Sequence, residues 1–301
     1  MRLNGTAIAQ EMYHELQDRV GELQKKNTTP HLVVILVGKN PASVAYVTLK
    51  KKKAEAIGAI VTILRYEEAV TTQELLEKLK QLNIDSSVHG ILIQRPLPSH
   101  INVAKLEETT NPDKDVDGFH PNSPYTLPLP LAVVKILEEV YDQTSPQPSP
   151  KRRGSTGSLS LEGEGEMLTK WLQSKSIVIL GKGPTGGGPI LAYLTKLHLK
   201  PTMIDSKTPN PDTQTQKADI IIAATGRETM ITPENVKQGV ILIGVGVLKG
   251  RDGKLHGDYE PEAIEDIASF YTPTPGGVGP VNVAKLMDNL ITAAEKQSKI
   301  I

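Results

Sequence analysis

Apolar residues in this chain of 301 residues fall into short runs that alternate with stretches of helical spacing. In the first half, the apolar runs lie at Leu32–Val37, Ile60–Arg65 and Gly90–Gln94. The intervening pattern predicts helices at roughly 5–25, 43–57 and 72–82. Short apolar runs between helices are typical of a parallel sheet with helices on both faces.

A second series of apolar runs occupies the C-terminal half. Its members are Ser176–Leu180, Thr202–Asp205, Asp219–Ala223 and Val240–Ile243. We therefore predict an α/β fold with two α/β lobes around a cleft, the C-terminal lobe a Rossmann-type doubly wound parallel sheet. An amphipathic stripe after Pro280 predicts a C-terminal helix over 281–297.

Residues 144–166 differ in composition from both halves. The segment is Pro-rich, then basic, then rich in Gly and Ser, then acidic, with almost nothing apolar to bury. Such a composition predicts a disordered insert. We therefore assign residues 1–143, with helix 281–297 packed back on them, to one domain and residues 167–280 to another.

Composition excludes several classes of function. Lys plus Arg and Asp plus Glu are equal at 34 each, so no net charge directs the chain to nucleic acid or to an anionic membrane. There is no cysteine for a disulfide, thiolate metal site or nucleophile, and the seven histidines show no metal-binding spacing. No apolar stretch is long enough to span a membrane, and a cytoplasmic protein is expected.

Ser43, Tyr46 and Lys50 are spaced by three and four residues, which places them on one face of a predicted helix. A lysine held beside an aromatic ring is partly desolvated, which lowers its pKa and allows proton transfer near neutral pH. Because Lys51, Lys52 and Lys53 follow directly, a solvated basic face is the alternative.

Three further segments bear on this choice, and they are Gly90–Pro98, Asp113–Pro121 and Thr272–Pro280. The second also resembles the start of a calcium-binding loop, but loop position twelve is Pro124 instead of glutamate, which excludes that site. With the helical Ser-Tyr-Lys pattern, the three segments resemble the bifunctional methylenetetrahydrofolate dehydrogenase/methenyltetrahydrofolate cyclohydrolase family in order and spacing.

That resemblance implies roles for residues of the N-terminal domain. It implies that Lys50 relays protons, that Gln94 lies beside it and that the Tyr46 ring stacks on a folate. It also implies that Asp117 accepts two hydrogen bonds from the pterin edge, for which a carboxylate is suited; a turn or capping role is the alternative. The remaining residues that it implies for folate binding are Ser43, Pro275, Gly276 and Gly277.

A glycine-rich segment, Gly181–Pro189, lies between a predicted strand and a predicted helix, the context of a dinucleotide-binding turn. A tight turn without a ligand is the alternative. Gly181 and Gly187 match the family's pattern, whereas Lys182 and Gly183 replace its arginine and serine. Val247 lies in a second segment whose sequence differs from the family's usual motif.

Asp205 ends the second strand of this domain, where an acidic side chain favours the ribose hydroxyl of NAD over the 2′-phosphate of NADP. It is followed by Ser206 and Lys207, and Lys182 and Lys207 could neutralise a phosphate. The resemblance favours NADP, with NAD also used, and it implies no metal.

The expected function is therefore oxidation of 5,10-methylenetetrahydrofolate and hydrolysis of the methenyl product, by a homodimer that acts on a small-molecule folate. Alternatives are a cyclohydrolase with weak or lost dehydrogenase activity, a non-catalytic folate- or nucleotide-binding relic, and a dehydrogenase of the shikimate or amino-acid type on a similar scaffold.

Overall fold

The computed structural model describes residues 1–145, 164–250 and 252–299. The chain divides into two compact units that do not follow chain order. Unit 1 consists of Met1–Gln10 and Leu129–Asn282, and unit 2 consists of Glu11–Pro128 and Val283–Ile301. Helices α1 (Gly5–Lys25), α5 (Pro128–Thr144) and α10 (Val278–Gln297) contribute residues to both units.

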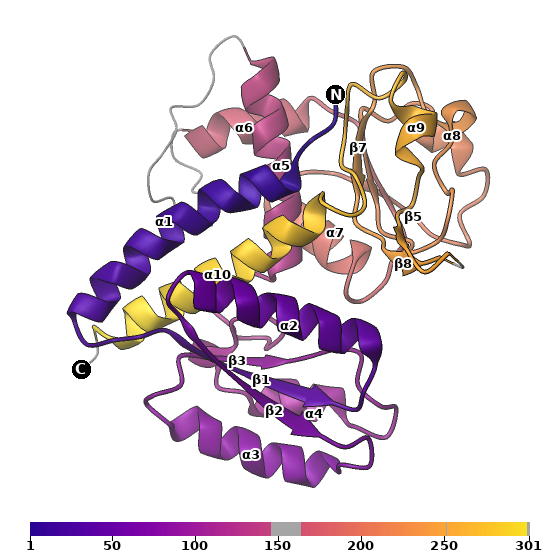
Figure 1. Cartoon of the computed structure of the whole chain (residues 1–301). Coiled ribbons are helices and arrows are strands. Elements are labelled where there is room, and N and C mark those ends of the chain that lie inside the picture. The colour runs from indigo at the N-terminus through magenta and orange to yellow at the C-terminus, as the bar shows by residue number, and fades with distance from the viewer. Residues whose placement is uncertain (146–163, 251, 300–301) are drawn as a thin grey trace. The chain divides into compact units, whose positions relative to one another are not determined.

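Unit 2 is built on a three-stranded parallel sheet of order β2-β1-β3. The strands are β1 (His31–Val37), β2 (Ile60–Tyr66) and β3 (Gly90–Ile93). The helices between and after them are α2 (Pro41–Ala56), α3 (Thr72–Ile84), α4 (Val103–Thr109) and the 3₁₀ helix η1 (Pro112–Lys114). Helices α2 and α3 cover opposite faces of this sheet (Figure 1).

The apolar runs of unit 2 form its core. Val33 and Ile35 of β1 pack with Leu75 and Leu79 of α3 and with Leu106 of α4, and each of the five is at most 2% exposed. The central strand has six buried residues in a row, because both of its faces are covered. The strands predicted from the sequence are therefore present, and the parallel arrangement is confirmed.

Unit 1 contains a five-stranded parallel sheet of order β10-β7-β6-β4-β5. The strands are β4 (Ile177–Leu180), β5 (Thr202–Ile204), β6 (Ile220–Ala223), β7 (Ile241–Gly244) and β10 (Phe270–Tyr271). Since β5 and β6 flank β4, the strand order reverses between β4 and β6, which is where doubly wound folds bind ligands.

Short elements complete unit 1. They are α6 (Glu164–Gln173), α7 (Gly187–Lys196), α8 (Asp212–Thr215), η2 (Pro233–Asn235), the antiparallel pair β8 (Leu248–Lys249) and β9 (Leu255–His256), and α9 (Pro261–Ile264). The sequence analysis did not identify α4, α6, α8, α9, β10 or the β8–β9 pair, all of which are ten residues or shorter.

The N-terminal residues extend the sheet of unit 1. Leu3 donates a backbone hydrogen bond to Tyr271, and the Tyr271 amide donates to Met1. These long-range pairings place Met1–Gln10 in unit 1, whereas the sequence analysis assigned residues 1–143 to one domain. The domain limits drawn from the sequence remain a prediction.

Most of the predicted insert 144–166 lies outside the described residues. Thr144 ends α5, and α6 begins at Glu164. Among the helices of the described ranges, none is both long enough and apolar enough to cross a membrane.

Candidate folate and dinucleotide sites

Helix α2 presents one buried face toward the core of unit 2. Asn40 caps the helix, since its side-chain oxygen accepts hydrogen bonds from the amides of Ala42 and Ser43 at 3.0 and 3.1 Å. Its buried residues are Ser43, Val47, Lys50 and Ala54, at helical spacing. Lys50 therefore lies on the buried face of α2.

Lys50 is only 5% exposed, and its ammonium is held by two of the residues expected around it. The Lys50 Nζ donates to Gln94 Oε1 at 3.1 Å and lies 4.6 Å from the centre of the Tyr46 ring. Burial lowers the pKa of Lys50, and the negative charge of Asp117 partly opposes that effect. The arrangement gives a lysine that can exchange a proton closer to neutral pH than an exposed lysine can.

Gln94 follows β3 directly, and both the oxygen and the nitrogen of its side-chain amide form hydrogen bonds. Its oxygen accepts from Lys50, so its nitrogen faces away and donates to the carbonyl of Arg95 at 2.5 Å. The register of β3 beside β1 thus brings together two residues 44 positions apart in the sequence.

The segment after η1 holds two aspartates with different surroundings. Asp115 forms the turn, because its carboxylate accepts from the amides of Gly118 at 3.2 Å and His120 at 2.7 Å. Burial raises the pKa of Asp117, and the positive charges of Lys50 and Arg95 lower it. The turn-forming role considered for Asp117 thus belongs to Asp115.

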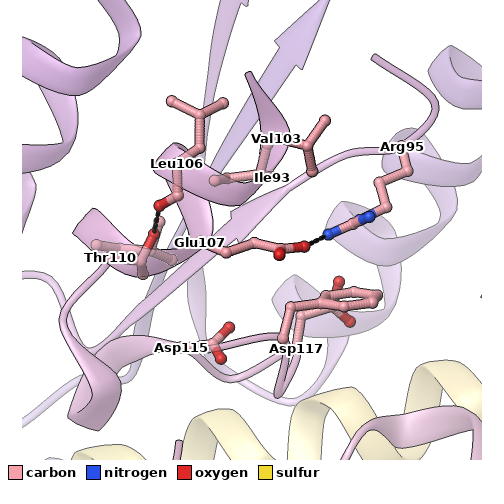
Figure 2. Close-up of a pocket in the computed structure, with 10 residues that line it drawn as sticks. Ile93, Arg95, Val103, Leu106, Glu107, Thr110, Asp115 and Asp117 are labelled. Atoms are coloured by element: carbon pink, nitrogen blue, oxygen red, sulfur yellow. Dashed lines mark hydrogen bonds and ion pairs between the residues drawn. The ribbon is translucent and has the colours of Figure 1, made fainter. Parts of the chain in front are cut away.

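Asp117 also lines a pocket within unit 2 of about 350 Å³, part of it open to solvent. Figure 2 shows the Arg95 and Glu107 side chains pointing toward each other across this pocket, where they form an ion pair. The Arg95 guanidinium also lies 3.8 Å from the centre of the Phe119 ring. The sequence analysis missed Arg95, although it directly follows Gln94 at the carboxyl end of a predicted strand.

The glycine-rich segment of unit 1 forms the expected strand–turn–helix. Gly181 has a φ of +92°, and a side chain there would meet the Ala224 carbonyl carbon and oxygen. A Cβ on Gly187 would lie 1.9 Å from the Gly181 carbonyl oxygen, so α7 can begin this close to β4 only with glycine. Lys182 and Gly183 are exposed on the turn between them, and the space beside Gly183 is open.

Asp205 lies just after β5 and closes a local turn. Its Oδ1 accepts from the Lys207 amide at 2.9 Å and from Thr208 Oγ1 at 3.2 Å, while Ser206 is exposed. The hydrogen bond from Lys207 makes the largest contribution to lowering the pKa of Asp205, and the charges of Lys182 and Lys207 lower it further. Lys182, Asp205 and Lys207 thus lie near one another at the carboxyl ends of the neighbouring strands β4 and β5.

The remaining predicted residues also belong to unit 1. Val247 follows β7 and is 53% exposed. Pro275, Gly276 and Gly277 precede α10, and a side chain on Gly277 would collide with the Pro273 carbonyl oxygen at 2.5 Å. Pro275, Gly276 and Gly277 thus belong to unit 1, whereas Ser43 and Asp117 belong to unit 2.

Two family models match the chain, one over each part of it. The description "tetrahydrofolate dehydrogenase/cyclohydrolase, catalytic domain" applies to residues 3–117, and "NAD(P)-binding domain" of the same family applies to residues 166–298. This chain belongs to the tetrahydrofolate dehydrogenase/cyclohydrolase family.

Full-length relatives agree with that assignment. A bifunctional protein FolD from Brevibacillus brevis is 38% identical over 303 residues, which cover 99% of this chain and 98% of the relative. One from Lactococcus lactis is 36% identical over 304 residues, covering 98% and 97% of the two chains. The family resemblance inferred from the sequence is therefore confirmed.

Solved structures of the family show the same fold. The bifunctional enzyme FolD from Campylobacter jejuni superposes with a TM-score of 0.84 at 34% identity, covering 98% of this chain and 99% of that one. A FolD from Trypanosoma brucei, solved with NADP and an inhibitor, gives 0.77 at 29% identity and covers 98% and 97%. The unusual residues in the C-terminal half thus do not remove it from the family.

Proposed function

We propose that this protein oxidises 5,10-methylenetetrahydrofolate with NADP and hydrolyses the methenyl product to 10-formyltetrahydrofolate. Family membership over both parts of the chain supports the two activities. The observation that carries the proposal is the buried Lys50, bonded to Gln94 and stacked on Tyr46, with Asp117 as its nearby counter-charge. No observation favours a non-catalytic relic.

In the hydrolytic step, Lys50 is the proton carrier. Water adds to the methenyl carbon and loses both protons as the formyl C=O forms: one passes to the ring nitrogen whose bond to that carbon breaks, and the other is released to solvent. A lysine with a lowered pKa can serve in both transfers near neutral pH. Gln94 accepts from Nζ and so orients it, while Tyr46 provides a flat face for the substrate ring.

Asp117 is the proposed anchor of the pterin. An ionised carboxylate accepts two parallel hydrogen bonds from an amino group and a ring N–H, as it does from arginine. Ser43, on the same face of α2 as Lys50, and Pro275–Gly277 complete the proposed folate contacts. The dehydrogenase step requires orientation above all, since the substrate's own nitrogens stabilise the developing positive charge.

The residues of unit 1 fit a dinucleotide. The space that a side chain would fill at Gly181 and Gly187 is occupied by backbone, which lets α7 begin close to β4. The first amides of α7 and the charge of Lys182 suit a pyrophosphate. When bound, NADP accepts the hydride. Gly183, Asp205, Ser206, Lys207 and Val247 are the further proposed contacts.

The proposal is tested by measuring hydride transfer and methenyl hydrolysis separately on the purified protein. NADPH formation from methylenetetrahydrofolate reports the first step, and loss of methenyltetrahydrofolate absorbance without NADP reports the second. Detection of both activities would support the proposal, and hydrolysis alone would indicate that the dehydrogenase activity has been lost. Absence of both activities would refute the proposal. A homodimer and a cytoplasmic location, both expected from the sequence analysis, are the finer parts of the proposal; light scattering tests the first.

We expect Asp205→Ser to raise the preference for NADP over NAD by about tenfold. The substitution removes a negative charge that opposes a 2′-phosphate, while serine can still accept the turn's hydrogen bond. Catalytic efficiency with each cofactor, at fixed methylenetetrahydrofolate, measures the change. Asp212→Asn, an exposed aspartate of the same unit, is the control. An unchanged ratio in Asp205→Ser would mean that this carboxylate does not face the ribose.

The charge of Arg95 predicts a pH effect. Folate binding requires ionised Asp117, so KM falls as pH rises through the pKa of Asp117. Arg95 lowers that pKa, so Arg95→Gln should raise it and move the acid limb of kcat/KM to higher pH. Well above the limb, KM should match wild type. An acid limb of folded Arg95→Gln that coincides with that of wild type would contradict this assignment of the limb to Asp117.

A further inference from the structure

Asp258 is a fully buried carboxylate of unit 1 at the end of the β8–β9 region, with an exposed fraction of 0%. Its Oδ1 accepts from the amides of Thr225 and Gly226, each at 3.0 Å, and from the Thr225 hydroxyl. Its Oδ2 accepts from the Gly246 amide at 2.9 Å. One side chain thus satisfies four donors from two separate loops.

The two loops are those that follow β6 and β7. Thr225 and Gly226 come just after β6, whereas Gly246 comes just after β7. Without Asp258, the Thr225 and Gly226 amides and the Thr225 hydroxyl would lose their acceptor, which is costly for partly buried donors. The Gly246 amide would keep only its second acceptor, the Ala223 carbonyl at 3.1 Å. The backbone carbonyl of Asp258 also accepts from the Met230 and Ile231 amides at 2.9 and 3.1 Å, which ties it to the chain beyond the first loop.

Around Gly246 the two loops and the Asp258 carboxylate are closely packed. A Cβ on Gly246 would lie 2.4 Å from Asp258 Oδ2 and 2.5 Å from the Gly226 nitrogen. Real Cβ atoms do not approach other atoms this closely, so glycine is required for the two loops and the carboxylate to meet. Val247, the next residue, then lies exposed at the surface.

These loops lie where a dinucleotide is expected. They leave the carboxyl ends of neighbouring parallel strands, and β6 is one side of the point where the strand order reverses. The glycine-rich turn leaves β4, the strand on the other side of that point, and the Gly181 backbone lies against Ala224. The position of the loop after β6 therefore affects the space available above β4.

We propose that Asp258 is a positioning residue for the dinucleotide site: it clamps the loops after β6 and β7 in the geometry that binds the cofactor. The inference rests on the proposed cofactor function and deepens it. Asp258 is buried beneath the loops and acts through them, since its oxygens are taken up by their amides. Its removal should weaken cofactor binding while the folate residues of unit 2 remain unaffected.

Asp258→Asn tests the clamp. If the asparagine oxygen keeps the Thr225 and Gly226 hydrogen bonds, its NH₂ group faces the Gly246 amide, so two donors oppose each other. The loop after β7 then loses its bond to residue 258 and is held at this point only by the bonds of Val245 and Gly246 to the Ala223 carbonyl. We expect KM for NADP to rise about tenfold, as expected for one lost hydrogen bond to a charged group. At saturating NADP, kcat should stay within about twofold of wild type, as should KM for methylenetetrahydrofolate. Asp266→Asn, an exposed aspartate of the same unit, should change none of these values.

Methenyl hydrolysis without NADP is the internal control, because it uses the residues around Lys50. A purely structural role would lower both activities together, and that result would overturn the proposal, as would a folded Asp258→Asn with unchanged KM for NADP. If Asp258→Asn does not fold, Thr225→Val, which removes one donor to the same carboxylate, decides by the same measure. Wild-type protein that shows no shift in melting temperature with NADP would instead refute the proposed cofactor function, and the clamp with it.

Discussion

Lys50→Met is expected to lower the rate of methenyltetrahydrofolate hydrolysis by about 10²- to 10⁴-fold, the usual contribution of a general acid–base group. Methionine keeps the volume of the buried stem but cannot carry a proton. The substitution removes a desolvated ammonium from a site that is only 5% exposed, and this gain offsets the lost hydrogen bond to Gln94 and the lost charge beside Asp117, so the protein should still fold. Hydrolysis rates at saturating substrate and the melting temperature measure the two effects.

A matched control is available on the same helix. Lys52 is exposed and lies two residues away, so Lys52→Met makes the same chemical change outside the buried face. Hydrolysis by Lys52→Met should equal wild type. Near-normal hydrolysis by Lys50→Met, with an unchanged melting temperature, would remove Lys50 from the mechanism and favour the view of this face as merely basic.

The strands of both sheets, except the two-residue β10, could be predicted from local pattern. The runs at 32–37 and 177–180 are apolar because β1 and β4 are covered on both faces and buried along nearly their whole length, whereas the edge strand β2 is mostly half-buried. Such a signal lies within a few consecutive residues and needs no knowledge of the fold. Elements of two to seven residues, such as α4 and β8, bury too little to leave a comparable pattern.

The contacts that form the site could not be predicted from local pattern, because they join positions that are distant in the sequence. The Lys50–Gln94 hydrogen bond spans 44 residues, and no periodicity indicates it. Family resemblance pointed to that pair, and the register of β3 on β1 accounts for it. Asp258 was missed altogether, since its partners Thr225 and Gly226 lie 33 and 32 positions upstream and an isolated aspartate in a loop carries no local signal.

The division into compact units also depends on contacts between distant positions, which the local sequence does not indicate. The sequence analysis divided the chain at residues 143 and 167 and assigned helix 281–297 to the first domain. The structure instead groups Met1–Gln10 with residues 129–282, because the first residues pair with β10 at the far end of the chain. Pairing of an edge strand depends on which backbone groups are left unpaired after folding, and the local sequence does not reveal that.

Asp117→Asn is expected to raise KM for the folate substrate by about 100-fold in both activities, or about 2.7 kcal/mol. A carboxylate accepts both pterin hydrogen bonds, whereas an amide accepts one and directs its own NH₂ at the second donor. Asp117 also raises the pKa of Lys50, so the asparagine variant should lower that pKa and shift the limb of the hydrolysis profile due to Lys50 to lower pH.

The control for this variant is Asp113→Asn, an exposed aspartate four residues upstream, which should leave KM unchanged. Full pH profiles of kcat and kcat/KM separate the two effects of Asp117. The loss of the carboxylate should abolish the acid limb of kcat/KM, because no group remains to be protonated at the pterin edge. The shift due to Lys50 should appear in kcat for hydrolysis alone. If KM for folate stays within about threefold of wild type, a change of less than 1 kcal/mol, Asp117 does not hold the pterin, and its charge serves only to set the protonation of Lys50.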